Sequence, residues 1–134
     1  MLSNKLTKRM AHKVLIYIKP TCSTCRKAVG ILDEMKVDYE KIDYFSHPLS
    51  KEKWAELLKK MGKKPIEILR TKEETFTELK LDKHPFSDEA LIEIMAAHPE
   101  LIQRPILEIE DKAILGRPPE CIKEFLHSVF NRSS

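Results

Sequence analysis

The sequence has few cysteines, few glycines and no long apolar run, and each shortage excludes a class of protein. Its 134 residues include three cysteines and three glycines. An odd number of cysteines in a chain of this length does not fit the disulfide framework of a small secreted protein. No stretch reaches the roughly 18 apolar residues of a membrane span, and the basic N-terminus lacks the apolar core of a signal peptide. We therefore expect a cytoplasmic protein that does not act at a membrane.

Charge is also nearly balanced. The formal net charge is +3, and the lysines are scattered among acidic residues, so direct binding to nucleic acid is not indicated. Apolar residues make up 42% of the chain, which is enough for an ordinary globular core. We expect one domain over residues 1–134, a flexible N-terminal arm at 1–12, and a monomer.

The first half of the sequence predicts a strand, a helix and a second strand. The apolar run from Val14 to Ile18 is typical of a buried strand, and Pro20 ends it. From Ser23 onward, apolar residues recur at helical spacing. The stretch 37–44 has loosely alternating strand residues. Two strands joined through one helix are expected to be parallel neighbours.

Residues from about 45 to 100 predict a helical insertion. Ser50 and Gly62 bound one helix, short helical pieces are expected at 65–69 and 76–81, and Ser87 caps a further helix. Two short strands then follow around a turn at Asp111, and a last helix comes after them. The predicted order is β-α-β, helical insertion, β-β-α.

The stretch "IYIKPTCSTCRKAV" places Cys22 and Cys25 three residues apart at the start of the first helix. A structural zinc site needs four ligands, but the chain has no second cysteine pair and its histidines are scattered. We therefore expect no metal site. A second alternative to thiol chemistry is that the two cysteines are packing residues of the core.

Thiol chemistry has a physical mechanism in this position. Free N–H groups and the positive end of the helix dipole favour the thiolate form of Cys22, and we expect Lys19 and Arg26 to lower its pKa further. Cys25 lies one turn along the same helix and can attack an adduct formed on Cys22. The pattern predicts a nucleophile, Cys22, and a resolving thiol, Cys25.

Four motifs occur in an order that resembles the arsenate reductase family of the ArsC type, which is related to the Spx regulators. These are "YIKPTCSTCR", "EILRTKEETFTELKL", "LIEIMAAHPELIQRPI" and "AILGRPPE". The resemblance covers most of the chain from Lys13 to Leu126. It implies an α/β thioredoxin-like fold with a mixed four-stranded sheet, and it makes Pro105 a candidate cis-proline opposite the cysteine turn.

The resemblance also implies roles for single residues. Cys22 falls on the catalytic cysteine of the family, and Arg70, Arg104 and Arg117 fall on its three oxyanion-binding arginines. Guanidinium groups suit arsenate because they stay charged and donate in a fork that fits two oxygens. No bound cofactor is implied, since electrons come from glutathione with glutaredoxin or from thioredoxin. Many members have serine where this chain has Cys25, which here allows a disulfide with Cys22.

The leading hypothesis is an arsenate reductase of arsenic detoxification, in which Cys22 attacks arsenate and thiol exchange releases arsenite. An Spx-like redox-sensing regulator that binds the RNA polymerase α subunit remains an alternative. So does a related thiol oxidoreductase with another substrate. Cys121, in the last predicted helix, is expected to be a half-buried packing residue.

Overall fold

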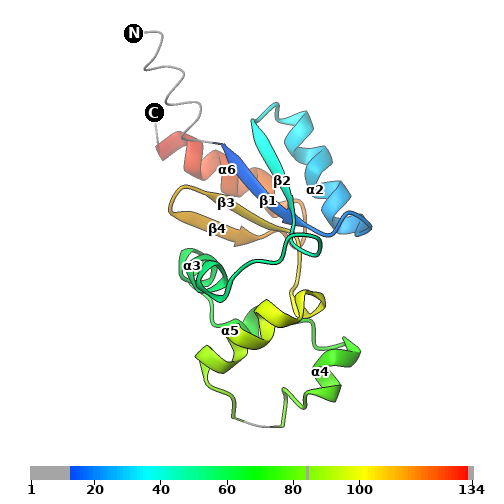
Figure 1. Cartoon of the computed structure of the whole chain (residues 1–134). Helices are drawn as coiled ribbons and strands as arrows, with labels where there is room; N and C mark the ends of the chain where they lie inside the picture. The colour runs from blue at the N-terminus through cyan, green and yellow to red at the C-terminus, as the bar shows by residue number, and fades with distance from the viewer. Residues whose placement is uncertain (1–12, 84, 133–134) are drawn as a thin grey trace. The chain divides into compact units, whose positions relative to one another are not determined.

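The computed structural model describes residues 13–83 and 85–132 (Figure 1). The chain divides into two compact units: the first combines the residues up to Ile42 with those from Arg104 onward, and the second is Asp43–Gln103. The single domain over 1–134 stays a prediction. The predicted arm at 1–12 lies outside the described residues. None of the helices described has the length and apolar character needed to cross a bilayer.

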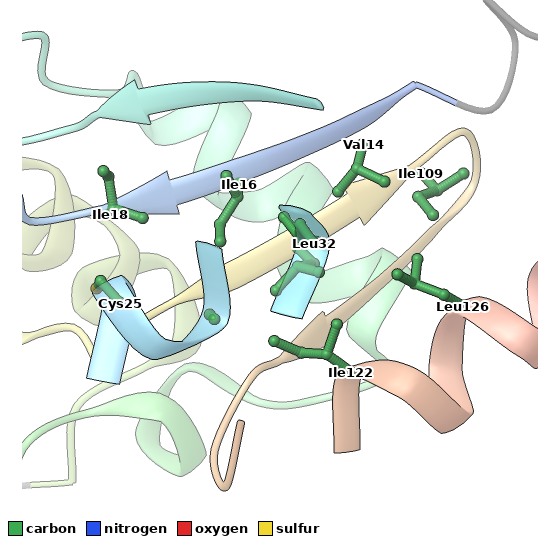
Figure 2. Close-up of a cluster of buried hydrophobic side chains, with 10 residues drawn as sticks. Val14, Ile16, Ile18, Cys25, Leu32, Ile109, Ile122 and Leu126 are labelled. Carbon is green, nitrogen blue, oxygen red and sulfur yellow. The ribbon is translucent and has the colours of Figure 1, made fainter. Parts of the chain in front are cut away.

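A mixed four-stranded sheet forms the centre of the first unit, as predicted. Its strands follow the order β2-β1-β3-β4. The arrows of β1 and β2 point the same way in Figure 2, whereas β3 pairs antiparallel with both β1 and β4. The strand bounds are β1 Val14–Ile18, β2 Tyr39–Asp43, β3 Ile106–Ile109 and β4 Lys112–Leu115.

Helices α2 (Ser23–Glu34) and α6 (Cys121–Arg132) contribute to the core on one face of this sheet. The helical spacing places Ala28 and Leu32 of α2 on one side, and alternation along a strand turns every second side chain toward them. Figure 2 shows the resulting cluster. Its fully buried members are Val14, Ile16, Ala28, Leu32, Leu107, Ile109, Ile122 and Leu126.

The other side of the β1–β3 pair contains a polar contact. Tyr17 and Glu108 are diagonal neighbours in the antiparallel register, in which Tyr17 is opposite Ile106. The Tyr17 hydroxyl donates a 2.6 Å hydrogen bond to Glu108 Oε1, and both residues are buried. This hydrogen bond links β1 and β3, strands that are far apart in the sequence.

The second unit is built mainly from helices. Ser50 Oγ accepts a hydrogen bond from the Lys53 amide at the start of α3, and Gly62, with φ of 67°, follows its end. The Tyr44 ring meets Trp54 edge-on, with centroids 5.5 Å apart. The helical segments are α3 Lys51–Met61, η1 Pro65–Ile68, α4 Glu74–Glu78, α5 Asp88–Ala97 and η2 Pro99–Leu101.

Candidate active site

The turn after β1 sets the position of Cys22. The Cys22 amide donates to the Lys19 carbonyl at 2.9 Å, which closes the turn, and the Arg26 amide donates to the Cys22 carbonyl at 3.1 Å. Cys22 is the N-cap residue of α2, with extended backbone angles of φ −82° and ψ 123°. At an N-cap, the side chain faces the free N–H groups two and three residues further on. Those residues are Thr24 and Cys25.

These surroundings favour the thiolate form of Cys22. Partial burial acts to raise its pKa, but the backbone and thiol of Cys25, the backbone of Thr24 and, last, the Arg104 guanidinium together lower the pKa below its ordinary value. The expected contributions of Lys19 and Arg26 are not among these main causes. The charge that assists the helix N-terminus comes instead from Arg104, a residue distant in the sequence.

The pKa of Cys25 is shifted in the opposite direction. Its side chain is buried, with 1% of the residue exposed. Burial first, and the neighbouring Cys22 sulfur, raise the pKa of Cys25 to about 12, against the lowering effects of the Lys19 backbone and Arg104. All three cysteines of the chain are free thiols in the structure. The pair therefore combines a cysteine whose pKa is lowered with one whose pKa is raised.

Arg104 and Arg117 lie in the same unit as the cysteine pair. Arg104 is 7% exposed, and the peptide bond between Arg104 and Pro105 is cis. Arg117 is exposed, and its Nη1 donates a 3.1 Å hydrogen bond to the backbone oxygen of Arg104. The structure thus brings Cys22, Arg104 and Arg117 into one connected arrangement.

Arg70 belongs to the second unit, so its proposed part in the site stays a prediction from the resemblance. Its amide donates to the Leu101 carbonyl at 2.6 Å, and its Nε lies 3.7 Å from Glu73 Oε2. That Nε is buried and donates no hydrogen bond to any of the residues described. A buried N–H of this kind is a donor that a bound anion can satisfy.

Cys121 shows that a helix start alone does not activate a thiol. It is the first residue of α6, is half-buried, and points its Sγ at the Leu115 carbonyl at 3.6 Å. Burial raises the pKa of Cys121, and the carboxylates of Glu120 and Glu124 raise it further. Cys22 differs from Cys121 in the groups that lower its pKa, which are those of Cys25 and Thr24 and the Arg104 guanidinium.

Two features of this site were not anticipated from the sequence. The first is the hydrogen bond from Arg117 to the backbone of Arg104, because no sequence pattern encodes a backbone oxygen as an acceptor. The second is that the causes of the Cys22 pKa shift include Arg104 but name neither Lys19 nor Arg26. Across 13–83 and 85–132, no three His, Cys, Asp or Glu residues form a group that could hold a metal ion.

Comparison with known proteins assigns a family to this arrangement. The sequence pattern of the ArsC family matches residues 17–125. An arsenate reductase structure from Vibrio cholerae is 36% identical, covers 84% of this chain and 97% of its own, and superposes with a TM-score of 0.80. The uncharacterized protein YfgD of Escherichia coli is 37% identical over 87% of this chain and 99% of its own. The global transcriptional regulator Spx of Listeria innocua is 33% identical over 84% of this chain and 86% of its own.

The thioredoxin-like α/β fold, the cysteine pair and these matches agree with the resemblance seen in the sequence. The chain belongs to the ArsC family.

Proposed function

We propose that this protein is a thiol-dependent arsenate reductase. The Cys22 thiolate attacks the arsenic of arsenate, an As–S bond forms, and an arsenate oxygen leaves as water after protonation. A second thiol then attacks the Cys22 sulfur. The S–S bond forms as the As–S bond breaks, the electron pair of that bond stays on arsenic, and arsenite departs. Two thiols are oxidised and As(V) is reduced to As(III).

The observation that carries this proposal is the position of Cys22 at the N-cap of α2, where groups of Cys25 and Thr24 and the Arg104 guanidinium lower its pKa. A thiolate and a multiply charged oxyanion repel each other, so a nucleophile for arsenate needs a fixed cation beside it. Arg104 supplies that cation and favours the nucleophilic form of Cys22 at the same time. Arg117 is held at the backbone of Arg104 and is proposed as a second anion ligand. Arg70 is retained from the resemblance as the third.

Cys25 is the second thiol in this proposal. Its high pKa results first from burial and also from the negative charge on Cys22. When Cys22 bonds to arsenic, that charge is lost, so the pKa of Cys25 falls and its thiolate becomes easier to form. The resolving thiol is thus restrained until the adduct exists. Glutathione with glutaredoxin, or thioredoxin, is the proposed electron donor, and no bound cofactor is needed.

The test is NADPH oxidation with arsenate, with the thioredoxin system and the glutathione–glutaredoxin system run in parallel. Wild type and Cys25→Ser are compared, and Cys22→Ser is the inactive control. We expect turnover by wild type and at least a 10-fold loss in Cys25→Ser. Turnover that survives in Cys25→Ser with glutathione would assign the second thiol to glutathione. Absence of arsenite with either system would refute the proposal.

An Spx-like regulator is the second candidate, because the Listeria regulator is 33% identical over most of this chain. In that role, oxidation of Cys22 and Cys25 to a disulfide would switch binding to the RNA polymerase α subunit. A pull-down with purified α subunit, using reduced and oxidised protein, tests this directly. Redox-dependent binding without arsenate turnover would favour the regulator. Turnover of a different tetrahedral oxyanion would favour a related oxidoreductase.

A further inference from the structure

The chain segment that leads into Arg70 is held by the last residues of the second unit. Leu69 and Ile102 pair in an isolated antiparallel bridge, and both residues are buried. On one side of this bridge, the Gln103 amide donates to the Ile68 carbonyl at 2.8 Å. On the other side, the Arg70 amide donates to the carbonyl of the residue before Ile102 at 2.6 Å. The backbone on either side of Leu69 is therefore fixed.

The side chain of Gln103 adds to this pairing. Its Nε2 donates hydrogen bonds to the carbonyl of Leu69 at 3.1 Å and to that of Glu67 at 3.4 Å. These carbonyls lie at the end of η1, and carbonyls at a helix end have no partner within the helix. A side-chain amide carries two N–H donors, so one glutamine can satisfy both. Gln103 thus contacts all three residues that precede Arg70.

These contacts restrain the main chain of Arg70 more firmly than its side chain. The Arg70 Nε lies 3.7 Å from Glu73 Oε2, beyond hydrogen-bond range, and donates no hydrogen bond to any residue in 13–83 or 85–132. A long side chain loses rotamer freedom when it binds an anion, and a fixed backbone leaves less freedom to lose. Preorganisation of this backbone should therefore increase the affinity of Arg70 for an oxyanion.

We propose that Gln103 is a positioning residue that holds Arg70 for a tetrahedral oxyanion. The inference rests on the proposed function, in which Arg70 is an anion ligand, and it names the residue that fixes this ligand in place. Gln103 acts through the backbone before Arg70 and needs no contact with the anion. Gln103 also directly precedes Arg104 in the chain, so the test has to separate an effect through Arg70 from one through Arg104.

The experiment measures sulfate binding to the full-length reduced protein by titration calorimetry, which involves no thiol chemistry. Gln103→Met keeps the approximate length of the side chain but removes both N–H donors, and Gln103→Leu is a second variant without them. Arg70→Gln and the double variant with Gln103→Met complete a mutant cycle. Ser50→Ala is the matched control, because it removes a side-chain hydrogen bond of the same unit, the one from the Lys53 amide, outside the segment before Arg70.

We expect both Gln103 variants to weaken sulfate binding about 2- to 10-fold, as the loss of such hydrogen bonds implies. Ser50→Ala should bind sulfate as wild type does. In the Arg70→Gln background, Gln103→Met should have no further effect, because its action passes through the removed guanidinium. With arsenate as substrate, the Gln103 variants should raise KM by a similar factor, with a smaller change in kcat.

The pKa of Cys22, followed by thiolate absorbance at 240 nm, separates the two arginines. It should be the same in Gln103→Met as in wild type, because Arg104 is one of the groups that lower this pKa and is unchanged in the variant. A raised Cys22 pKa in Gln103→Met would show that Gln103 acts through Arg104, and would overturn the inference.

Four results with sulfate would also overturn it: no binding to wild type, no loss in Arg70→Gln, an equal loss in Ser50→Ala, or a loss that persists when Arg70 is already replaced. Failure of this inference is distinguishable from failure of the proposed function. Sulfate binding that depends on Arg70 and Gln103, without arsenite formation, would refute only the arsenate reductase. Arsenate turnover with an unchanged KM in both Gln103 variants would refute only the positioning role.

Discussion

Arg117 Nη1 donates a 3.1 Å hydrogen bond to the backbone oxygen of Arg104, the residue whose own guanidinium stabilises the Cys22 thiolate. The two arginines therefore differ in how they reach the nucleophile. Arg104 is buried and acts on the sulfur directly, whereas Arg117 is exposed and contacts the main chain of Arg104. This difference leads to a prediction about the pKa of Cys22.

Replacement of Arg104 by glutamine should raise the pKa of Cys22, because it removes a cation that lowers that pKa. Arg117→Gln removes the same charge, but Arg117 is not among the causes of the lowered pKa, so this variant should raise the pKa of Cys22 by less. The measurement is thiolate absorbance at 240 nm against pH, with Cys25 and Cys121 replaced by serine. Equal effects of the two variants would contradict the assignment of Arg104 as the direct partner.

Alkylation of the three cysteines should occur in a fixed order as pH rises. Only the thiolate reacts, so the alkylation rate of each cysteine falls when pH drops through its pKa. The pKa of Cys22 is lowered from 9.0, that of Cys121 is raised, and that of Cys25 is raised to about 12. Iodoacetamide with peptide mapping between pH 5 and 10 should therefore modify Cys22 first. Modification of Cys25 at the same pH as Cys22 would be inconsistent with this order.

A methyl group at Gly116 should destabilise the first unit. A Cβ at that position would lie 3.1 Å from Pro105 Cγ, 3.2 Å from Leu107 Cδ1 and 3.3 Å from Ile122 Cδ1. All three neighbours are buried, so we expect Gly116→Ala to lower the free energy of unfolding by about 1–3 kcal/mol.

Gly30→Ala is the control for this prediction, because a Cβ at Gly30 in α2 meets no atom within 4 Å. Alanine is the better helix former, so this variant should raise the free energy of unfolding by about 0.5–1 kcal/mol. Urea denaturation measures both values. A stabilised Gly116→Ala protein would show that Pro105 and its neighbours can move aside.

Removal of the Tyr17 hydroxyl should cost about 1–3 kcal/mol of unfolding free energy, because it takes a donor away from the buried Glu108 carboxyl. Tyr39→Phe provides a matched comparison. Tyr39 also donates a 2.6 Å hydrogen bond to a carboxylate, that of Asp33, but in an exposed position. Solvent replaces that hydrogen bond, so the cost should stay below about 0.5 kcal/mol. Similar losses for both variants would mean that burial does not decide the effect.

The sequence predicted those features that depend on neighbouring residues. The strand at Val14–Ile18, the helix that follows it and the N-cap at Ser50 each rest on a local pattern, and the structure contains all three. Cys22 was placed at a helix start for the same reason. Its strongest cationic partner could be named only through the resemblance, because Arg104 reaches it through the pairing of β1 with β3. The hydrogen bonds of Arg117 and Tyr17 depend on that same pairing, which no local pattern specifies.

The pairing of β1 with β3 also determines when the site can form during synthesis of the chain. Its two halves are separated by the entire second unit, and the Tyr17–Glu108 hydrogen bond spans 91 positions of the chain. A nascent polypeptide therefore exposes Cys22 on the ribosome long before Arg104 has been translated. Until β3 emerges and joins β1, Cys22 lacks the contribution of the Arg104 guanidinium to its lowered pKa. Full reactivity is thus a property that the chain acquires only late in its own translation.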